Sequence, residues 1–206
     1  MNKIISSDAL TAYLQCQRKA FLLICTNDKG IPNEYEEIIR KQKMITRDRY
    51  ITAVKQSGSD IQLYSINNLK SGSDLLINAT LRMDGAEADC DILTKAKVYS
   101  NLGRYSYEPI IVIGMCNISK EQELDLYFAG HLLGHIQGSA PAFGTIINVR
   151  GEPHRLRLEK SAEIFTATIN SLRDWAAPRT IDPPPIILNK HCSYCQFQSL
   201  CKSEAE

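Results

Sequence analysis

The chain has 206 residues, and its 24 Lys and Arg residues nearly balance its 23 Asp and Glu residues. This length predicts one domain with a core large enough to fold unaided. The balanced charge gives no global sign of a nucleic-acid partner, although a local basic patch remains possible. No apolar run approaches the roughly 20 residues needed to span a bilayer, and the polar N-terminus is unlike a signal peptide. We therefore expect a cytoplasmic protein without a membrane partner.

The N-terminal part, residues 1–57, is predicted to be helical. Two serines precede an amphipathic run over residues 8–24, which is typical of a capped helix, and Cys16 falls in its middle. A recurring apolar face predicts a second helix over residues 34–56. The other face of that helix is rich in Lys and Arg, which we interpret as a solvated surface in preference to a phosphate-contacting one.

The middle part, residues 58–158, is predicted to form a sheet core with a crossover helix. Apolar runs bounded by Ser, Asn and Gly predict strands over 61–66, 75–82, 88–98, 105–113, 143–149 and 154–158. Between the fourth and fifth strands, Ser119 and Gln122 have the spacing of a capping box, which begins a helix that ends near residue 136.

The C-terminal part, residues 159–206, is predicted to contain a helix over 161–176 that Pro178 ends. Three consecutive prolines then form a stiff lead into a cysteine-rich loop. The order of elements predicts an α/β fold, with a mixed central sheet flanked by helices.

The cysteines indicate a metal site. Cys192, Cys195 and Cys201 form a Cys-x2-Cys-x5-Cys loop, and Cys16 supplies a fourth thiolate if the fold brings the two ends of the chain together. In a reducing cytosol, clustered cysteines are more often metal ligands than disulfides. The other cysteines lie in apolar stretches, where we expect buried structural thiols: Cys25, Cys90 and Cys116.

Two metals fit this pattern. The Cys-x2-Cys pair beside His191 could be half of a zinc site. Zinc sites usually take their ligands from two short loops, however, whereas the fourth cysteine here is distant. The spacing therefore favours a [4Fe–4S] cluster that ties the C-terminal loop to the first helix, with Zn²⁺ as the alternative.

The pattern as a whole resembles a known family. A lone cysteine in an N-terminal helix followed by basic residues, strands with an Asp, a crossover helix and a terminal cysteine loop are similar to RecB-like nucleases with an iron–sulfur cluster. This family includes CRISPR-associated RecB-like exonucleases. A Tyr-Glu-Pro strand and the later residues Gln137, Gly138 and Pro141 look most like uncharacterised RecB-like putative nucleases. The resemblance implies the PD-(D/E)XK (restriction-endonuclease-like) fold over nearly the whole chain.

The resemblance also implies a catalytic site. Such nucleases hold Mg²⁺ or Mn²⁺ with an Asp on one strand and an acid-x-Lys motif on the next. Asp91 matches the first position, with Asp89 as a close alternative, but the next strand offers Ile111 and Ile113. The nearest candidates are Glu108 and Lys120, while Asp125 stands where the family helix commonly has Gln.

We therefore favour a nuclease-like protein whose catalytic site is degenerate. The alternative is an active Mg²⁺- or Mn²⁺-dependent DNA exonuclease with a displaced site formed by Asp91, Glu108 and Lys120, with Glu123 or Asp125 as a further ligand.

Three histidines are weaker candidates. His131 and His135 are four apart on the crossover helix, a spacing that can bind metal, but we favour a surface or groove position. His154 alternates with arginines in a strand, where a solvated face is favoured over a phosphate-binding groove.

Two functions remain open at this point. The first is action on or binding of DNA, as single strands or ends, through a basic groove formed by Arg18, Lys19, Arg40, Lys43 and Arg47. The second is a scaffold in which the cluster stabilises a module that docks a protein partner in a nucleic-acid-processing assembly.

Overall fold

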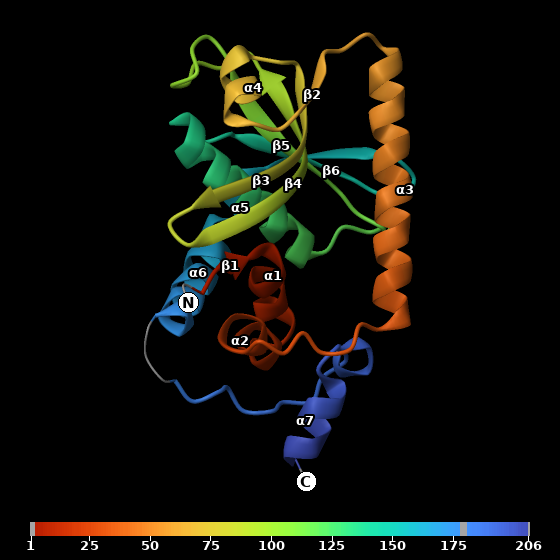
Figure 1. Ribbon diagram of the computed structural model, residues 1–206, viewed down its shortest axis with the longest axis vertical. Helices are drawn as coiled ribbons and strands as arrows, with labels where there is room; N and C mark the ends of the chain where they lie inside the picture. Colours follow the sequence, from red (N-terminus) through yellow and green to blue (C-terminus); the bar gives the residue numbers. More distant parts are fainter. Residues whose placement is uncertain (1–2, 178–180, 206) are drawn as a thin grey trace.

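One mixed sheet with helices on both faces organises the protein (Figure 1). The structure, a computed structural model, describes residues 3–177 and 181–205. It confirms the expected α/β class. The elements follow in this order: β1 (Ile5–Ser6), α1 (Ser7–Gln15), α2 (Gln17–Cys25), α3 (Glu34–Gln56), β2 (Ile61–Leu63), α4 (Ile66–Ser71), β3 (Leu75–Met83), β4 (Ala86–Ala96), β5 (Ser106–Val112), α5 (Lys120–Gln137), β6 (Phe143–Ile147), β7 (Pro153–Arg157), the 3₁₀ turn η1 (Leu158–Ser161), α6 (Ala162–Ala176), the 3₁₀ turn η2 (Cys192–Tyr194) and α7 (Gln198–Ala205).

The sheet has the strand order β2-β3-β4-β5-β6-β7, and β1 pairs with β4. Strands β3, β4 and β5 form an antiparallel meander. Helix α5 then carries the chain across the sheet, so that β6 lies parallel to β5, and β7 returns antiparallel to β6. A parallel pair needs such a crossover connection, which is why the long helix falls between β5 and β6.

The larger core lies on the face that α5 covers. Apolar residues of this helix are buried, among them Leu124, Phe128 and Leu132, at 0%, 0% and 3% exposure. They recur four residues apart and therefore lie on one side of the helix. Full burial of each such side chain contributes about 2 kcal/mol. Helices α1 and α6 complete this layer by packing against α5.

Helix α3 stands apart along the other side of the sheet (Figure 1). It has the predicted bounds, but Thr46 and Ile51 are the only described residues of it that are buried. It passes so close to the end of β5 that a side-chain carbon at Gly114 would collide with the Ile39 carbonyl oxygen. Few apolar contacts hold this helix, so polar contacts carry more of its attachment to the sheet.

The structure corrects three details of the sequence-based predictions. The first predicted helix breaks in two at Cys16, and the strand expected over 61–66 is only Ile61–Leu63, followed by α4. Cys116 is exposed and Cys25 is only partly buried, so Cys90 alone is the expected buried thiol. Helix α6 ends at Ala176, and Pro178 lies outside the described residues.

The Gln137-Gly138-x-x-Pro141 segment has a structural role. The fully buried Gln137 amide accepts from the Tyr107 N–H at 2.8 Å and donates to the Tyr107 and Ser139 carbonyls at 3.1 and 2.8 Å. Gly138 ends α5 with φ +66°, a left-handed conformation that suits glycine. The segment thus joins the crossover helix to the start of β5.

Candidate functional site

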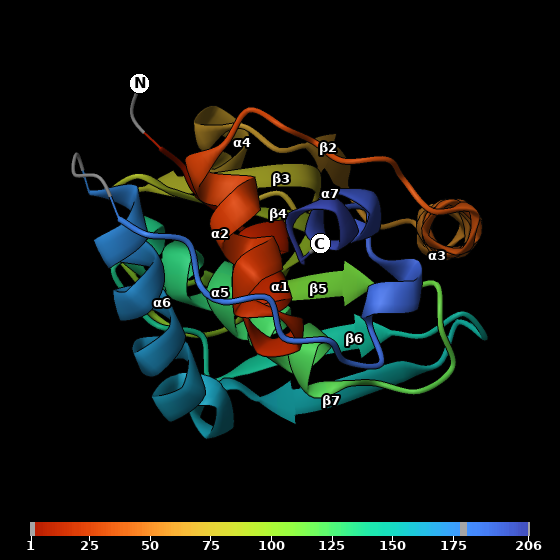
Figure 2. The same ribbon diagram turned by 90° about the horizontal axis from the view of Figure 1, so that it is seen from below.

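The C-terminal loop is tied to the N-terminal helices (Figure 2). The Asn189 side chain donates to the Gln15 carbonyl at 3.2 Å, and the Gln196 side chain donates to the Lys29 carbonyl at 2.6 Å. The Ile31 N–H donates in turn to the Gln196 carbonyl at 2.8 Å. Phe197, at 1% exposure, is the apolar anchor of the loop. These contacts bring the two ends of the chain together, as a shared metal site requires.

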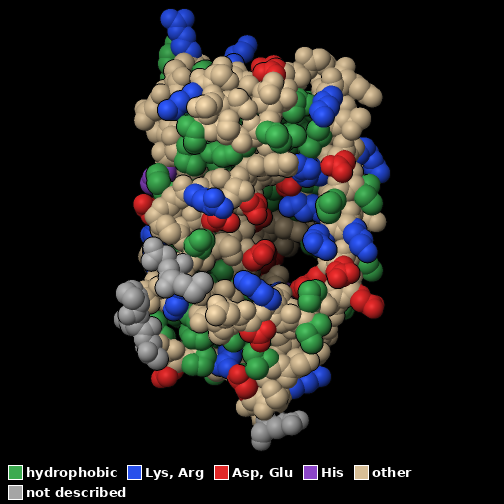
Figure 3. Space-filling model, viewed as in Figure 1, with side chains coloured by type: hydrophobic (Ala, Val, Ile, Leu, Met, Phe, Trp, Pro, Cys, Tyr) green, Lys and Arg blue, Asp and Glu red, His purple; other side chains and the backbone are tan. Residues whose placement is uncertain are grey.

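All four predicted metal ligands line one cavity of about 850 Å³, called here the thiol cavity. Its walls come from the joint between α1 and α2, from the first half of α3 and from residues 186–202. A space-filling view shows the molecule hollowed between α3 and its body (Figure 3). The cavity-lining cysteines are Cys16, Cys192, Cys195 and Cys201.

The backbone explains how each thiol reaches the cavity. Cys16 is extended, with φ −162° and ψ 113°, and forms the corner where α1 meets α2. Cys192 begins the turn η2, whose last hydrogen bond joins the Cys195 N–H to the Cys192 carbonyl at 3.2 Å. Cys201 lies one helical turn into α7, and its N–H donates to the Phe197 carbonyl at 3.0 Å. The corner and the two turns present the cysteines to a common space.

The thiols influence one another. Burial raises the pKa of Cys195, and the thiols of Cys16 and Cys192 act in the same direction. Burial also raises the pKa of Cys201, with further contributions from Cys195 and Cys16, whereas Arg18 opposes the shift. Without a metal, Cys195 and Cys201 are therefore neutral thiols at neutral pH. Metal binding would have to displace their protons.

The donor set suits a thiolate-bound metal, but the thiols do not meet at a point. Over residues 3–177 and 181–205, no three Cys, His, Asp or Glu side chains are arranged to hold a metal ion. A tetrahedral zinc ion, with Zn–S bonds of about 2.3 Å, would require the sulfur atoms to converge on one point.

Four of the five predicted groove residues also line the thiol cavity, but most are paired with acids. Arg18 pairs with Glu204, and Lys19 lies 3.4 Å from Glu36. Arg40 is exposed and makes no ion pair among the described residues. The cavity lining carries five Lys or Arg residues and two Glu residues, so it has a positive excess: Arg18, Lys19, Arg40, Lys43, Lys202, Glu36 and Glu121.

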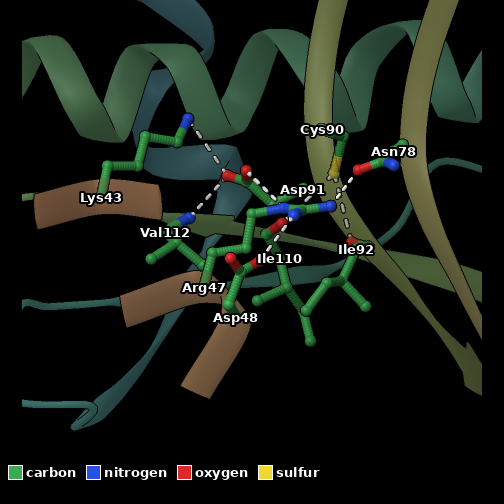
Figure 4. Close-up of polar contacts among 9 residues, drawn as sticks. All are labelled: Lys43, Arg47, Asp48, Asn78, Cys90, Asp91, Ile92, Ile110 and Val112. Carbon is green, nitrogen blue, oxygen red and sulfur yellow. Dashed lines mark hydrogen bonds and ion pairs between the residues drawn. The ribbon is translucent and has the colours of Figure 1, made fainter. Parts of the chain in front are cut away.

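Asp91 lies in a second site, on the sheet beneath α3 (Figure 4). One carboxylate oxygen, Oδ2, is 3.2 Å from Lys43 Nζ and accepts from the Val112 N–H at 2.8 Å. The other oxygen is 3.4 Å from Arg47 Nε, and the Asp91 side chain is only 10% exposed. We call Asp91, Lys43 and Arg47 the charge cluster. Both oxygens of the carboxylate are already engaged by groups of the protein.

Asp125 of α5 adds a second carboxyl group that acts on Lys43. Burial would by itself lower the pKa of Lys43, but the carboxylates of Asp91 and Asp125 outweigh it and raise the pKa. Burial raises the pKa of Asp125 to about 6, against the opposing effects of the Ser7 hydroxyl and the Lys43 ammonium group. Asp125 Oδ1 is buried and has no hydrogen-bond partner among the described residues. The cluster therefore sits beside a carboxyl group that is costly to ionise.

The backbone next to the charge cluster is strained. Asn78 lies within β3 opposite Asp91 and has φ 60°, an uncommon conformation that Asn tolerates better than most residues. Regular pairing with β4 is interrupted there, and the Asn78 side-chain oxygen accepts from Arg47. The contact with Arg47 helps to hold this conformation, as expected where surrounding structure fixes a strained residue.

The other proposed catalytic residues are not in the charge cluster. Glu108 accepts two hydrogen bonds from Arg155 of β7, at 3.0 and 3.1 Å. Lys120 and Glu123 are exposed, and Asp89 is exposed and accepts from Thr80 at 2.8 Å. The acid-x-Lys positions are buried core residues, with Ile111 at 2% and Ile113 at 6% exposure.

The histidines lie at the surface. His131 and His135 stack edge to face, 4.7 Å between ring centroids, and border a groove beside residues 138–141. Burial lowers the pKa of His131, and His135 and Arg173 act in the same direction. His154 is exposed on the edge strand β7.

Sequence reasoning missed two features of these sites. It did not pair Lys43 and Arg47 with Asp91, although their spacing of four residues places them on one helix face. It also missed Tyr35 and Tyr194, half-exposed tyrosines of the cavity lining whose ring centroids are 5.3 Å apart. No local pattern links residues so far apart in the chain.

Comparison with models of known protein families gives no match, and comparison with curated proteins gives none either. Of the described helices, none combines the length and the apolar character needed to cross a membrane.

Proposed function

We propose that this chain is an iron–sulfur protein of RecB-like, PD-(D/E)XK type that binds DNA as single strands or ends and has lost hydrolysis at Asp91. The convergence of Cys16 with the three loop cysteines on one cavity carries the proposal. The antiparallel meander with Asp91 on its middle strand, followed by a crossover helix, supports the fold type. We place the protein in the reducing cytosol, where such a cluster persists.

The cluster would be held by the four cysteines and would have a structural role. When bound, it supplies covalent links between the α1–α2 joint and the C-terminal loop. The Cys-x2-Cys-x5-Cys spacing of the loop, together with the distant Cys16, favours a [4Fe–4S] cluster over a single Zn²⁺ ion. The apolar lining, which includes Ile186 and the buried Phe197, would limit access of water to the group.

DNA binding is supported by what surrounds the thiols. Arg40 and Lys202 make no ion pair among the described residues and would be available to phosphate groups. Tyr35 and Tyr194, 48% and 52% exposed, offer ring faces on which unpaired bases can stack. Stacking needs bases that are not enclosed in a duplex, so we expect single strands or frayed ends to bind best.

Loss of hydrolysis is supported by the charge cluster. Catalytic Mg²⁺ is normally held by carboxylates together with water and substrate oxygens. Here the carboxylate that the resemblance assigns to the metal ion has Lys43 and Arg47 as its partners. The neighbouring strand supplies isoleucines in place of an acid and a lysine.

The test begins with metal content. We expect protein purified without oxygen to be brown, with about four iron and four sulfide per chain. Cys16→Ser should lose the iron, whereas Cys116→Ser, an exposed cysteine outside the cavity, should retain it. Colourless protein loaded with zinc would contradict the cluster.

Activity and binding are tested on the same preparation. Single-stranded DNA should bind with an affinity that falls steeply as salt rises, and Mn²⁺ should give no cleavage. Cleavage that Asp91→Ala abolishes would overturn the inactive interpretation and would favour an active site that includes Asp91.

A partner-docking scaffold is the second candidate. Ile187 and Leu188 line the thiol cavity and are 67% and 77% exposed, and Ile31 nearby is 73% exposed. Exposed apolar groups gathered at one site are typical of protein contacts. Absence of DNA binding at low salt, together with a protein that co-purifies stably, would favour this function.

A further inference from the structure

Arg18 is a buried charged residue beside the thiol cavity. It lies two residues after Cys16 on α2 and is 9% exposed. Its Nη1 group donates to the Pro184 carbonyl at 2.9 Å, and its Nη2 group pairs with Glu204. Its third nitrogen, Nε, is buried and has no hydrogen-bond partner among the described residues.

An unsatisfied buried donor is costly. Leaving such a group without an acceptor typically costs about 1–3 kcal/mol, and native proteins rarely do so. Because the guanidinium group is always protonated, Arg18 cannot remove the cost by losing its charge. The orphaned Nε–H therefore points to an acceptor that is part of the working protein.

The surroundings identify the chemistry of this acceptor. Arg18 lines the same cavity as the four cysteines. An ionised thiolate or a sulfide in the cavity would be an anionic acceptor for the Arg18 Nε–H. A neutral thiol would be a much weaker acceptor. A donor held by two other contacts, to Pro184 and Glu204, would be fixed in place before the acceptor arrives.

We propose that Arg18 donates its Nε–H to sulfur of the cysteine-bound cluster and thereby raises the reduction potential of that cluster. This inference rests on the proposed function. Hydrogen bonds to sulfur and nearby positive charge stabilise the more negative, reduced form.

The test measures the reduction potential of the iron-loaded protein by voltammetry, with iron content determined for every variant. Arg18→Gln removes the charge and the Nε donor, so its potential should fall below that of the unaltered protein. Arg18→Lys keeps the charge but lacks Nε, and its potential should lie between the two. The Arg18→Lys variant also tests the role of Arg18 if the Arg18→Gln variant is unstable.

Glu204→Gln is the matched control, since it frees the same guanidinium group from its acid while leaving Nε in place. Removal of a nearby negative charge should leave the potential unchanged or raise it. Equal potentials in the unaltered protein and both Arg18 variants would overturn the role of Arg18 while leaving the cluster in place. A fall in Glu204→Gln matching that in Arg18→Gln would show that loosening of the loop causes the shift, which also overturns it. Unaltered protein without iron would overturn the proposed function itself.

Discussion

The thiol cavity and the charge cluster differ in how completely their polar and charged groups are paired with other groups of the protein. Both were expected to bind metal. At the charge cluster, Lys43, Arg47 and a backbone N–H engage both oxygens of Asp91. At the thiol cavity, four cysteines face a common space, and a neighbouring arginine nitrogen lacks an acceptor within residues 3–177 and 181–205. A site whose charges are already paired has little affinity left for a metal ion. A site with unpaired polar groups is stabilised when a metal group supplies their partners.

The largest expected effect tests the dependence of the thiol cavity on metal. Helix α7 has no buried residue, so little besides Phe197 holds it by apolar contact. Removal of iron by a chelator should therefore release residues 186–205 while the sheet persists. Hydrogen exchange followed by mass spectrometry should show lost protection confined to this segment. Unchanged protection would mean that metal does not hold the loop.

The next effect tests the internal pairing of the charge cluster. Asp91→Ala leaves Lys43 and Arg47 without their acid, and breaking a mostly buried pair costs about 3 kcal/mol. Asp48→Ala is the control, because Asp48 also pairs with Arg47, at 3.3 Å, but its side chain is 70% exposed. That change should cost less than about 1 kcal/mol. Urea unfolding measures both, and similar losses would show that burial does not matter here.

The carboxyl group of Asp125 should make the folding stability of the protein depend on pH. Its pKa of about 6 exceeds the ordinary value of 3.8, so between these values the folded protein binds a proton that the unfolded chain does not. The protonated group makes its full contribution to folding stability below pH 3.8, and this contribution is lost as the pH rises through 6. Asp125→Asn should thus stabilise the protein by about 2 kcal/mol near neutral pH and by little near pH 4.

Urea unfolding at several pH values measures this difference. Glu123→Gln, an exposed position on the same helix, is the control and should change stability by less than about 0.5 kcal/mol. A stabilisation by Asp125→Asn that does not shrink on acidification would contradict the ionisation of a buried carboxyl group.

The smallest effect compares two glycines with left-handed backbones. Gly30 has φ +63°, and a side-chain carbon there would come within 2.6 Å of the Gln196 carbonyl oxygen. Gly58 has φ +82° and open space around it. Gly58→Ala should cost about 1 kcal/mol through backbone strain alone. Gly30→Ala should cost more and should also lower iron content, because it displaces the cysteine loop. Equal iron content in the two variants would show that this contact does not position the loop.

Much of the fold could be predicted because its signals are local. The bounds of α3 follow from a periodic apolar face, and the start of α5 follows from the Ser119–Gln122 capping box, which the structure contains. The corner at Cys16 could not be predicted, because the apolar period continues through it without Gly or Pro. The packing of α1 and α2 against α5 and α6 favours a corner over a continuous helix at this position.

The sequence by itself determined which residues could take part in each site: four cysteines at the two ends of the chain, and one Asp on a strand without an acid or lysine on the next. Tertiary structure alone decided their partners. It brought the cysteines to one cavity, and it placed Lys43 and Arg47 of α3 on Asp91. The reason is physical. Periodicity and capping act over a few residues, whereas the state of a buried charge or thiol depends on groups that only packing brings near.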